Sequence, residues 1–382
     1  MTALEGIELL RLRLPLVAPW VTAHGTVRSR DVLLVRAVVG GVDGWGECVA
    51  QSEPTYSSEY VDGAQDVLRR HLVPALMSSG VASGAGVAGA LASVKGHPMA
   101  KAALELAVLD AELRVAGVPL ARYLAGVADP PGDSVPASVP AGVAVGISGS
   151  IRELLDEIDR RVSDGYRRVK LKIHPGWDVV PVSAVRRRHG PDLLLQVDAN
   201  GSYAGRADPA AELAPLDHAG LLMVEQPLAD DDLLGHAELA ARLDTPVCLD
   251  ESITSVATAA TALALGACSV VNVKAGRVGG YLAAVRLHDL CRALGATVWC
   301  GGMLETGVGR AANLALAALP NFSLPGDISA SDRFWASDIV TPPAVLDDRG
   351  SIAVPDGPGL GVEMTGISDR VVWRDWTGAA RS

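Results

Sequence analysis

The stretch LLLQVDAN at residues 193–200 is a short apolar run that ends in a carboxylate, and the same form returns twice downstream. Residues 221–227 read LLMVEQP, and residues 246–252 read PVCLDES. Each run has the length of one β-strand, and the segments between the runs have the apolar spacing of helices. Strands that alternate with helices at this length form a parallel sheet with right-handed crossovers.

The residues that end these strands recur at a nearly constant interval. Runs of the same kind occupy residues 141–147, 167–172, 269–276 and 296–302. The strand-end residues follow one another at intervals of 24 to 27 residues, close to the roughly 31 residues of one strand–helix unit of a barrel with its loops. A closed barrel gathers such residues at one mouth, whereas an open sheet scatters them along a crevice. We therefore expect a barrel whose strands end at Lys172, Asp198, Glu225, Asp250, Lys274 and Gly301.

The two ends of the chain have a different pattern. Residues 1–130 contain strand-like runs joined at a glycine-containing turn and a long amphipathic helix that ends near Gly117, which predicts an α+β capping domain. Residues 131–339 would form the barrel. Residues 340–382 are rich in proline and glycine, and we expect them to pack back on the capping domain. We interpret the stretch 78–93, mostly alanine, glycine and serine, as a mobile connection.

Composition and charge exclude several classes of function. The 382 residues carry 33 basic and 44 acidic side chains, a net charge of −11, with no basic stripe for nucleic acid. Five widely spaced cysteines are typical of free thiols in a reducing compartment. Residues 254–273 lack charge over the length of a membrane span, but their composition changes midway and indicates a helix followed by a buried strand. We expect a cytoplasmic protein that binds neither membranes nor nucleic acid.

Three consecutive strands end in carboxylates, Asp198, Glu225 and Asp250. Any one of them could simply cap the following helix. Three carboxylates that meet at a barrel mouth repel one another, and a hard divalent cation with oxygen ligands relieves this repulsion. The sequence therefore predicts a Mg²⁺ site, which Mn²⁺ or another divalent ion could also occupy.

Lysines flank these carboxylates on both sides. Lys170 and Lys172 share one face of their strand because side chains alternate along a strand, and Lys274 ends the strand after the third carboxylate. A solvated strand face would explain the pair alone, but not the third lysine. A lysine sheltered from water beside other cations has a lowered pKa, which suits a general base. We therefore expect these lysines to be catalytic, with pKa values drawn towards neutrality.

Together these motifs resemble the enolase superfamily, in its muconate-lactonizing subgroup. The resemblance covers essentially the whole chain and includes VKLK, VDAN, VEQP and LDES in that order. It implies a (β/α)7β TIM-like barrel with an α+β capping domain, and a metal-stabilised enediolate. By this resemblance Lys172 is the base on one face of the substrate and Lys274 its counterpart on the other, while Lys170 supports the substrate carboxylate and lowers the pKa of Lys172. Asn200 and Glu251 would lie behind the metal ligands.

Further stretches resemble the o-succinylbenzoate synthases and the N-acylamino acid (N-succinylamino acid) racemases grouped with them. These stretches are residues 44–60, 273–280 and 300–335. The resemblance implies Mg²⁺-dependent syn-dehydration of 2-succinyl-6-hydroxy-2,4-cyclohexadiene-1-carboxylate to o-succinylbenzoate for menaquinone synthesis, with racemisation of N-acylamino acids as a second activity. A dedicated N-succinylamino acid racemase with the same two-lysine site is the alternative.

The resemblance also implies a small-molecule carboxylate substrate bound between cap and barrel, and a homo-oligomer. The sequence departs from the pattern at Ala144, where serine is common, and at Trp20, Ala23 and His24, where Phe, Ser and Phe are usual. These departures leave the metal and base chemistry in place and concern the choice of acyl group. The residues expected to bind substrate are Trp20, His24, Tyr56, Arg277, Gly302 and Met303.

Two other interpretations use the same residues. A Schiff-base aldolase would use Lys172 or Lys274, would need no metal, and would be trapped by borohydride. A non-enzymatic metal-binding protein would explain the three carboxylates, but it leaves the three lysines without a role.

Overall fold

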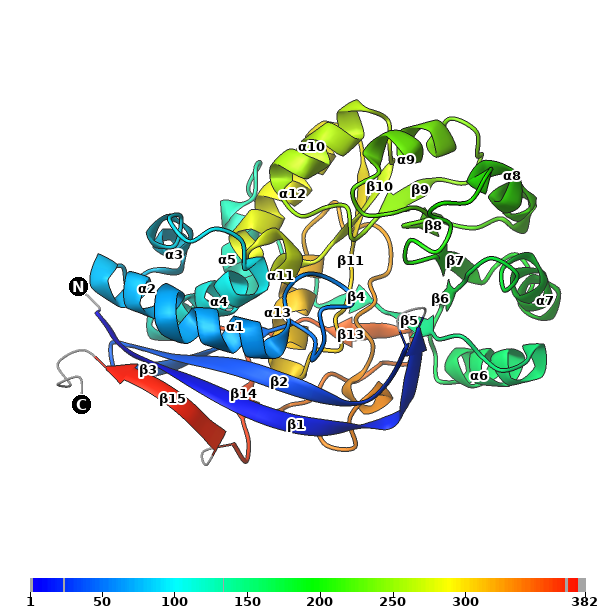
Figure 1. The fold of residues 1–382 in the computed structure, drawn as a ribbon. Coiled ribbons are helices and arrows are strands. Elements are labelled where there is room, and N and C mark those ends of the chain that lie inside the picture. Colours follow the sequence, from blue (N-terminus) through cyan, green and yellow to red (C-terminus); the bar gives the residue numbers. More distant parts are fainter. Residues whose placement is uncertain (1–2, 23–24, 133, 368–369, 377–382) are drawn as a thin grey trace.

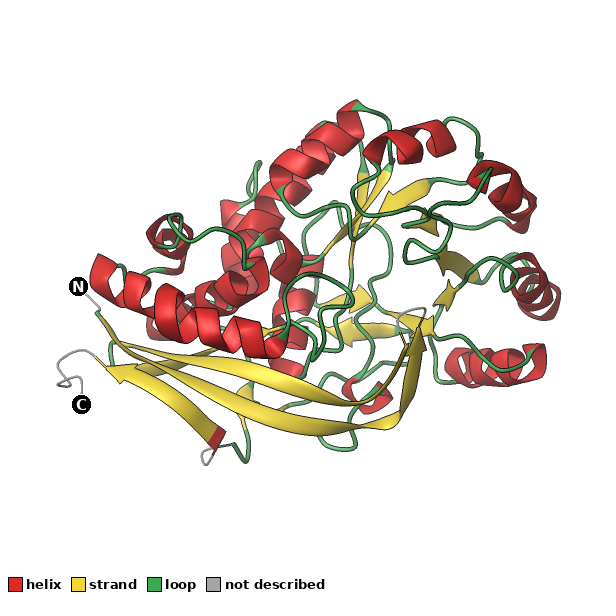
Figure 2. Ribbon diagram, viewed as in Figure 1, coloured by secondary structure: helices red, strands yellow, loops and turns green. Residues whose placement is uncertain are grey.

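The computed structural model describes residues 3–22, 25–132, 134–367 and 370–376. One sheet forms a curled wall with helices around its outside, and a second sheet lies across one end of this wall (Figure 1). Figure 2 shows the contrast between the long strands of the second sheet and the short strands of the wall.

The curled wall is an all-parallel sheet, and within the described residues it has seven strands in the order β11-β10-β9-β8-β7-β6-β5. Most residues of these strands are buried, as expected for a parallel sheet covered by helices. The strands are β5 Gly142–Val145, β6 Arg168–Lys172, β7 Leu194–Asp198, β8 Val224–Glu225, β9 Val247–Leu249, β10 Val270–Val273 and β11 Thr297–Cys300. The helices after them are α6 Ile151–Ser163, α7 Val179–His189, α8 Pro209–Leu213 with η2 Ala214–Ala219, α9 Leu233–Ala240, α10 Val256–Ala264, α11 Ala275–Val278 with α12 Tyr281–Ala293, and α13 Gly307–Ala317.

The register of the wall brings the strand ends to one level. Lys172 is the register partner of Asp198, and Asp198 is in turn the partner of Glu225. Because the strands are parallel, their carboxyl ends all lie at the same rim. The residues that end successive strands therefore meet there, as their spacing in the sequence predicts.

An eighth segment, residues 326–328, closes the wall between β11 and β5 without forming a regular strand. The Asp327 N–H donates to the Cys300 carbonyl at 2.9 Å, and the Gly142 N–H donates to the Gly326 carbonyl at 2.8 Å. In the described part of the chain, seven strand–helix pairs are thus followed by one extended segment. The predicted fold class, a (β/α)7β barrel with an α+β cap, is confirmed.

The second sheet is antiparallel, in the order β15-β1-β2-β3. Strands β1 (Leu4–Thr22) and β2 (Gly25–Val39) form a long hairpin that β3 (Val42–Cys48) extends. Near the C-terminal end of the chain, β15 (Val371–Trp376) pairs with β1. Short strands before it form two further pairs: β4 (Ser138–Pro140) with β13 (Ser351–Ala353), and β12 (Val340–Thr341) with β14 (Glu363–Met364).

Helix α4 (Pro98–Ala116) packs on this sheet through two glycines of β3. A Cβ atom at Gly46 would lie 2.0 Å from the Ala103 carbonyl oxygen, and one at Gly44 would also meet the helix backbone. The helix ends as predicted at Gly117, whose φ of 67° is left-handed. It is not amphipathic, because α11 of the barrel packs against it as well and most of its residues are buried. The other cap helices are α1 Val61–Val67, η1 Leu68–Leu72, α2 Val73–Ser79, α3 Gly84–Ala90 and α5 Leu120–Val127.

Two stretches of simple composition have regular structure. The prediction of a mobile connection at 78–93 is wrong, because α3 lies there with Val87 buried and Gly84 against Leu109. Residues 254–273 contain α10 and β10, as predicted. Among the described helices, none is long and apolar enough to cross a membrane by itself; the pair Val61–Ser79 and Gly84–Ala90 meets that criterion only jointly, bent by 118°.

The hairpin of β1 and β2 reaches the barrel rim where the strand ends lie. The Ile147 N–H, just after β5, donates to the Val21 carbonyl at 3.3 Å. The pairing of β1 with β2 is irregular between Pro15 and Trp20, and Figure 1 shows the hairpin turning upwards at its far end, beside β5. The cap therefore covers part of the rim.

Candidate active site

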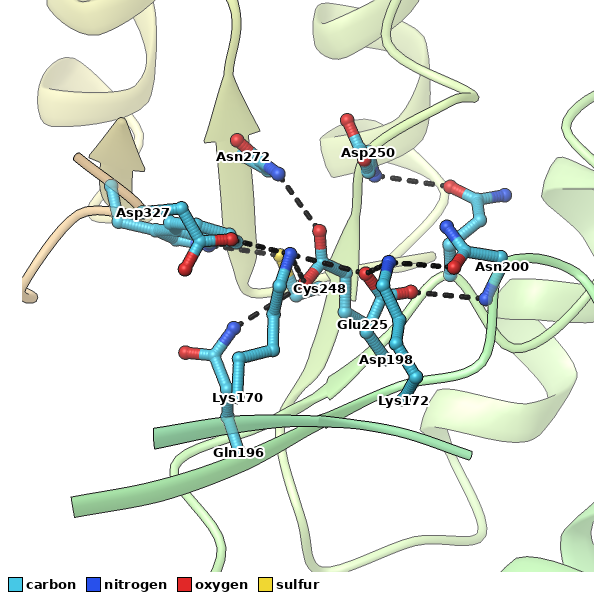
Figure 3. Close-up of polar contacts among 12 residues, drawn as sticks. Lys170, Lys172, Gln196, Asp198, Asn200, Glu225, Cys248, Asp250, Asn272 and Asp327 are labelled. Carbon is cyan, nitrogen blue, oxygen red and sulfur yellow. Dashed lines mark hydrogen bonds and ion pairs between the residues drawn. The ribbon is translucent and has the colours of Figure 1, made fainter. Parts of the chain in front are cut away.

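Lys170 and Lys172 extend from the end of β6 in the same direction, towards carboxylates of the neighbouring strands (Figure 3). The Lys172 ammonium group lies 2.6 Å from Asp198 Oδ2 and donates to Asn200 Oδ1 at 2.6 Å. The Lys170 ammonium group lies 3.1 Å from both Asp198 Oδ2 and Glu225 Oε2. Side-chain alternation thus turns both lysines into the site.

A third lysine approaches the carboxylates from the other side. Lys274 follows β10, and its ammonium group lies 2.8 Å from Asp250 Oδ2 and 3.1 Å from the Tyr56 hydroxyl. Arg277 Nη1 pairs with Asp250 Oδ1 and donates to the Tyr56 hydroxyl at 3.0 Å. In the sheet, the strands that lead to the three carboxylates, β7, β8 and β9, lie between β6 and β10. A lysine therefore stands at each flank of the carboxylate group.

Burial and neighbouring charges shift the pKa values of the carboxyl groups in opposite directions. Asp198, Glu225 and Asp250 are at most 1% exposed. Burial raises the pKa of Glu225, the charge of Asp198 raises it further, and Lys170 offsets these effects only in part. Burial also disfavours the charged form of Asp198, but Lys172 and Lys170 outweigh it and hold the pKa of Asp198 below its usual range.

The predicted lowering of the pKa is wrong for Lys170 and Lys274 in this arrangement. Burial lowers the pKa of Lys170, but the charges of Asp327 and Glu225 outweigh burial and raise the pKa well above its usual value. Burial also disfavours the charged form of Lys274, and the charge of Asp250 more than compensates, so that this pKa is raised too. Carboxylates lie within 3.1 Å of both ammonium groups, and their charge outweighs that of the neighbouring cations.

The predicted metal ligands have the chemistry that a divalent cation requires. Asp198, Glu225 and Asp250 offer only carboxylate oxygens, the donors that Mg²⁺ and Mn²⁺ prefer. Each is paired with a lysine, and as the described side chains stand, no three acidic, histidine or cysteine groups converge closely enough to hold an ion. The donor set and its location at adjacent strand ends fit a divalent ion that would take over part of this charge pairing.

Asn200 connects Asp198 to Glu251. The Asn200 N–H donates to Asp198 Oδ1 at 3.0 Å, and its side-chain amide donates to Glu251 Oε1 at 2.8 Å. The φ of Asn200 is 43°, a left-handed value that these bonds hold in place. Glu251 Oε2 is buried and has no hydrogen-bond partner among the described groups. A buried carboxylate oxygen without a donor supports the interpretation that a cation binds beside it.

A cavity of about 590 Å³ lies between the cap and the barrel rim. Residues of the predicted substrate-binding set that line it are Trp20, Tyr56, Gly302 and Met303. Arg277 is 3% exposed and lies behind Asp250, away from the cavity wall. His24 lies outside the described residues. Ala144, where the sequence departs from the family pattern, is on the wall.

Sequence reasoning missed Asp327 and the nearby Arg168 and Trp299 side chains. Asp327 lies in the eighth segment, and its Oδ2 is 2.6 Å from the Lys170 ammonium group. Its Oδ1 accepts a hydrogen bond from Arg168 Nη1 at 2.6 Å. Arg168 Cζ and Lys170 Nζ lie 4.9 and 5.0 Å from the centroid of the Trp299 ring. The Asp327 carboxylate therefore lies between two cations that both face the Trp299 ring. It holds Lys170 in place from the side where the eighth segment closes the barrel.

Two amides that sequence reasoning also missed bind Glu225. Gln196 Nε2 donates to Glu225 Oε2 at 3.3 Å, and Asn272 Nδ2 donates to Glu225 Oε1 at 2.8 Å (Figure 3). Gln196 and Asn272 each precede a predicted site residue by two positions, so the period of a strand would have placed them on the same face. Asp327 carries no such signal, because its segment is not a regular strand.

Known proteins resemble this chain in both sequence and fold. Residues 153–367 match the family described as enolase C-terminal domain-like, and residues 7–125 match the mandelate racemase / muconate lactonizing enzyme N-terminal domain. An N-succinylamino acid racemase from an Amycolatopsis species is 57% identical over 94% of this chain and 94% of its own length. An o-succinylbenzoate synthase from Geobacillus kaustophilus is 46% identical over 94% of this chain and 93% of its own.

A solved structure extends the comparison to three dimensions. A member of the enolase superfamily from Listeria innocua, 37% identical, has a TM-score of 0.91 and covers 98% of this chain and 99% of its own. The agreement spans the capping domain, the barrel and the strand ends that carry the lysines and carboxylates. This chain therefore belongs to the enolase superfamily, in the branch that contains the o-succinylbenzoate synthases and the N-succinylamino acid racemases, and it is an enzyme.

Proposed function

We propose that this enzyme moves the α-proton of a small carboxylate substrate with Lys172 and Lys274, beside a Mg²⁺ or Mn²⁺ ion held by Asp198, Glu225 and Asp250. The observation that carries the proposal is the position of the two lysines, one at each flank of the carboxylate-bearing strands. A substrate whose α-carbon lies above the strand ends has an amino group near each of its faces. The ion, when bound, supplies positive charge that stabilises the enediolate form of the substrate carboxylate.

The first reaction is the syn-dehydration of 2-succinyl-6-hydroxy-2,4-cyclohexadiene-1-carboxylate to o-succinylbenzoate. Lys172, in its neutral form, accepts the α-proton, and the electron pair of the C–H bond passes into the substrate carboxylate. Return of that pair forms the aromatic ring as the C–O bond to the neighbouring hydroxyl breaks. Lys172 gives its proton to the departing hydroxyl, which leaves as water, so that one group serves as base and acid on one face. Lys274 and Lys170 stabilise the negative charge as ammonium groups.

Racemisation of N-succinylamino acids at the same site is the second candidate. One observation favours it: the Amycolatopsis relative, 57% identical, is an N-succinylamino acid racemase. Racemisation would also use as a base Lys274, which the proposed dehydration needs only for its charge. Lys172 would take the α-proton from one enantiomer while Lys274 delivers a proton to the opposite face. The reverse transfer would act on the other enantiomer.

The cavity suits a substrate with an acyl arm. The rings of Trp20 and Phe334 on its wall lie 5.9 Å apart, edge to face, and we place the acyl chain against them.

We further assign the dehydration to menaquinone synthesis in the cytoplasm, where free thiols persist. All five cysteines are free and buried. A homo-oligomeric state stays a prediction from the family resemblance.

Removal and return of the metal test this proposal. Enzyme treated with a chelator and desalted should neither form o-succinylbenzoate nor racemise N-succinylphenylalanine, and added Mg²⁺ or Mn²⁺ should restore activity. Full turnover in excess chelator, with elemental analysis finding no bound metal, would contradict the metal site. Inactivation by borohydride in the presence of substrate would point instead to a Schiff base.

A further inference from the structure

The two lysines that flank the carboxylates are held by different parts of the molecule. Lys172 has both of its partners, Asp198 and Asn200, on the barrel, at 2.6 Å each. Lys274 has one partner on the barrel, Asp250 at 2.8 Å, and one on the capping domain, the Tyr56 hydroxyl at 3.1 Å. The position of Lys274 therefore depends on the cap in a way that the position of Lys172 does not.

Tyr56 belongs to the loop between β3 and α1, which Figure 1 shows beside α11. Its hydroxyl receives hydrogen bonds from Lys274 Nζ at 3.1 Å and from Arg277 Nη1 at 3.0 Å. Because lysine and arginine only donate, the phenolic proton is left for Asp250 Oδ1, 3.1 Å away. The Tyr56 hydroxyl thus accepts two hydrogen bonds and donates one, which fixes its orientation among three barrel residues.

The same contacts limit the directions available to the Lys274 amino group. Two of its tetrahedral directions point to Asp250 and Tyr56, and the Tyr56 ring lies under it, with Nζ 4.6 Å from the ring centroid. Lys274 also lines the cavity, so a remaining direction is open to a substrate there. Without the Tyr56 hydroxyl, the flexible Lys274 side chain would let Nζ rotate about its remaining hydrogen bond to Asp250.

We propose that Tyr56 is a positioning residue for Lys274, through which the capping loop controls proton transfer at one face of the substrate only. This inference rests on the proposed function, since it assigns proton transfer to Lys274. Racemisation uses both lysines as acid and base, so it depends on Tyr56. Dehydration needs proton transfer by Lys172 alone and only the charge of Lys274, so it tolerates the loss of the hydroxyl. Tyr56 thereby sets the ratio of the two activities.

Hydrogen exchange in D₂O tests the proposal with the variant Tyr56→Phe, which keeps the ring and removes the hydroxyl. Proton NMR follows loss of the α-proton signal of N-succinyl-L-phenylalanine and, separately, of its D enantiomer. The Lys274→Ala variant identifies which enantiomer gives its proton to Lys274. Exchange of that enantiomer should fall about tenfold in Tyr56→Phe, the size expected for one lost hydrogen bond, while exchange of the other stays within about twofold.

Two controls separate positioning from a general disturbance of the cap. Tyr60→Phe, in the same loop at a side chain that is 39% exposed, should leave exchange of both enantiomers unchanged. Adding Tyr56→Phe to Lys274→Ala should cause no further loss, because the tyrosine acts through that lysine. Equal loss for both enantiomers, no loss for either, or a further loss in the double variant would overturn the proposal.

A crystal structure of Tyr56→Phe tests the proposal without any substrate. Lys274 Nζ should spread over several positions around its contact with Asp250, while Lys172 Nζ keeps its two partners. An unchanged, well-ordered Lys274 would overturn the inference whatever the activity of the enzyme. If the wild type exchanged neither enantiomer and made no o-succinylbenzoate, the proposed function would fail, and this structural result would still decide the positioning role.

Discussion

At the barrel mouth, each lysine is paired with a carboxylate of a neighbouring strand. Lys170 and Lys172 contact Asp198, and Lys274 contacts Asp250. Removing one member of a buried pair leaves its partner unpaired, which typically costs about 3–5 kcal/mol. The side-chain period of a strand and the register of the sheet predict these neighbours. The pKa values were not predictable, because they depend on distances to carboxylates such as Asp327 that no local pattern places.

Of the three proposed metal ligands, Glu225 is the one whose charge we expect can be removed with least harm to the fold. Because burial and Asp198 raise its pKa, Glu225→Gln resembles the protonated side chain, and we expect the unfolding midpoint to move by only a few degrees. We propose that the free carboxylate is a ligand of the ion, so Mn²⁺ affinity should fall at least tenfold and turnover about a hundredfold.

Titration with Mn²⁺ followed by electron paramagnetic resonance measures the affinity of this variant. Glu238→Gln, at an exposed position of α9, is the matched control and should bind Mn²⁺ as the wild type does. Wild-type Mn²⁺ affinity in Glu225→Gln would remove this residue from the metal site.

The strands and helices of the barrel could be predicted from apolar runs and their spacing, because each strand–helix unit is local in sequence. Helix α3 could not, because three of the seven residues of Gly84–Ala90 are glycine, which disfavours a helix, and the helix is held by burial against α4. The eighth segment was also missed, since it closes the barrel through single backbone hydrogen bonds to Cys300 and Gly142. Features that depend on tertiary contact leave little trace in a single sequence.

The contact of β3 with α4 gives a prediction about stability. In Gly46→Ala the new methyl group would lie 2.0 Å from the Ala103 carbonyl oxygen, so helix and sheet must move apart. We expect the free energy of unfolding in urea to fall by about 1–3 kcal/mol. Gly89→Ala, in α3 with no heavy atom within 4 Å of the new Cβ, should be neutral or stabilising by up to about 1 kcal/mol. Equal effects of the two substitutions would disprove the close contact.

Where the cap meets the barrel, buried glutamates of the cap accept hydrogen bonds from the first residues of barrel helices. Glu47 accepts from Thr306 Oγ1 at 2.7 Å and from the Gly309 N–H at 3.1 Å, at the start of α13. Glu105 of α4 accepts from the Leu282 N–H at 3.0 Å, at the start of α12. Burial raises the pKa of each to about 7. The joint between cap and barrel therefore contains carboxyl groups that titrate near neutrality.

The Glu105 carboxyl makes the stability of the joint depend on pH. Its pKa of about 7 in the folded protein lies above the ordinary value of 4.5. Its contribution is therefore complete below about pH 4.5 and is lost as the pH rises through about 7. Between pH 5.5 and 8 the wild type should lose about 2 kcal/mol more unfolding free energy than Glu105→Gln. Urea unfolding at both pH values, in chelator so that metal binding does not contribute, measures the difference; parallel pH profiles would contradict it.

The proposed function requires that Lys172 and Lys274 act on opposite faces of one α-carbon. The most direct measurement follows α-proton exchange and racemisation of N-succinyl-L- and N-succinyl-D-phenylalanine in D₂O for Lys172→Ala and Lys274→Ala, with circular dichroism to check folding. Each variant should lose racemisation by about 10²-fold or more, and each should retain exchange of only one enantiomer, the opposite one in the two variants. Racemisation at the wild-type rate in either variant, or exchange of the same enantiomer by both, would contradict the claim.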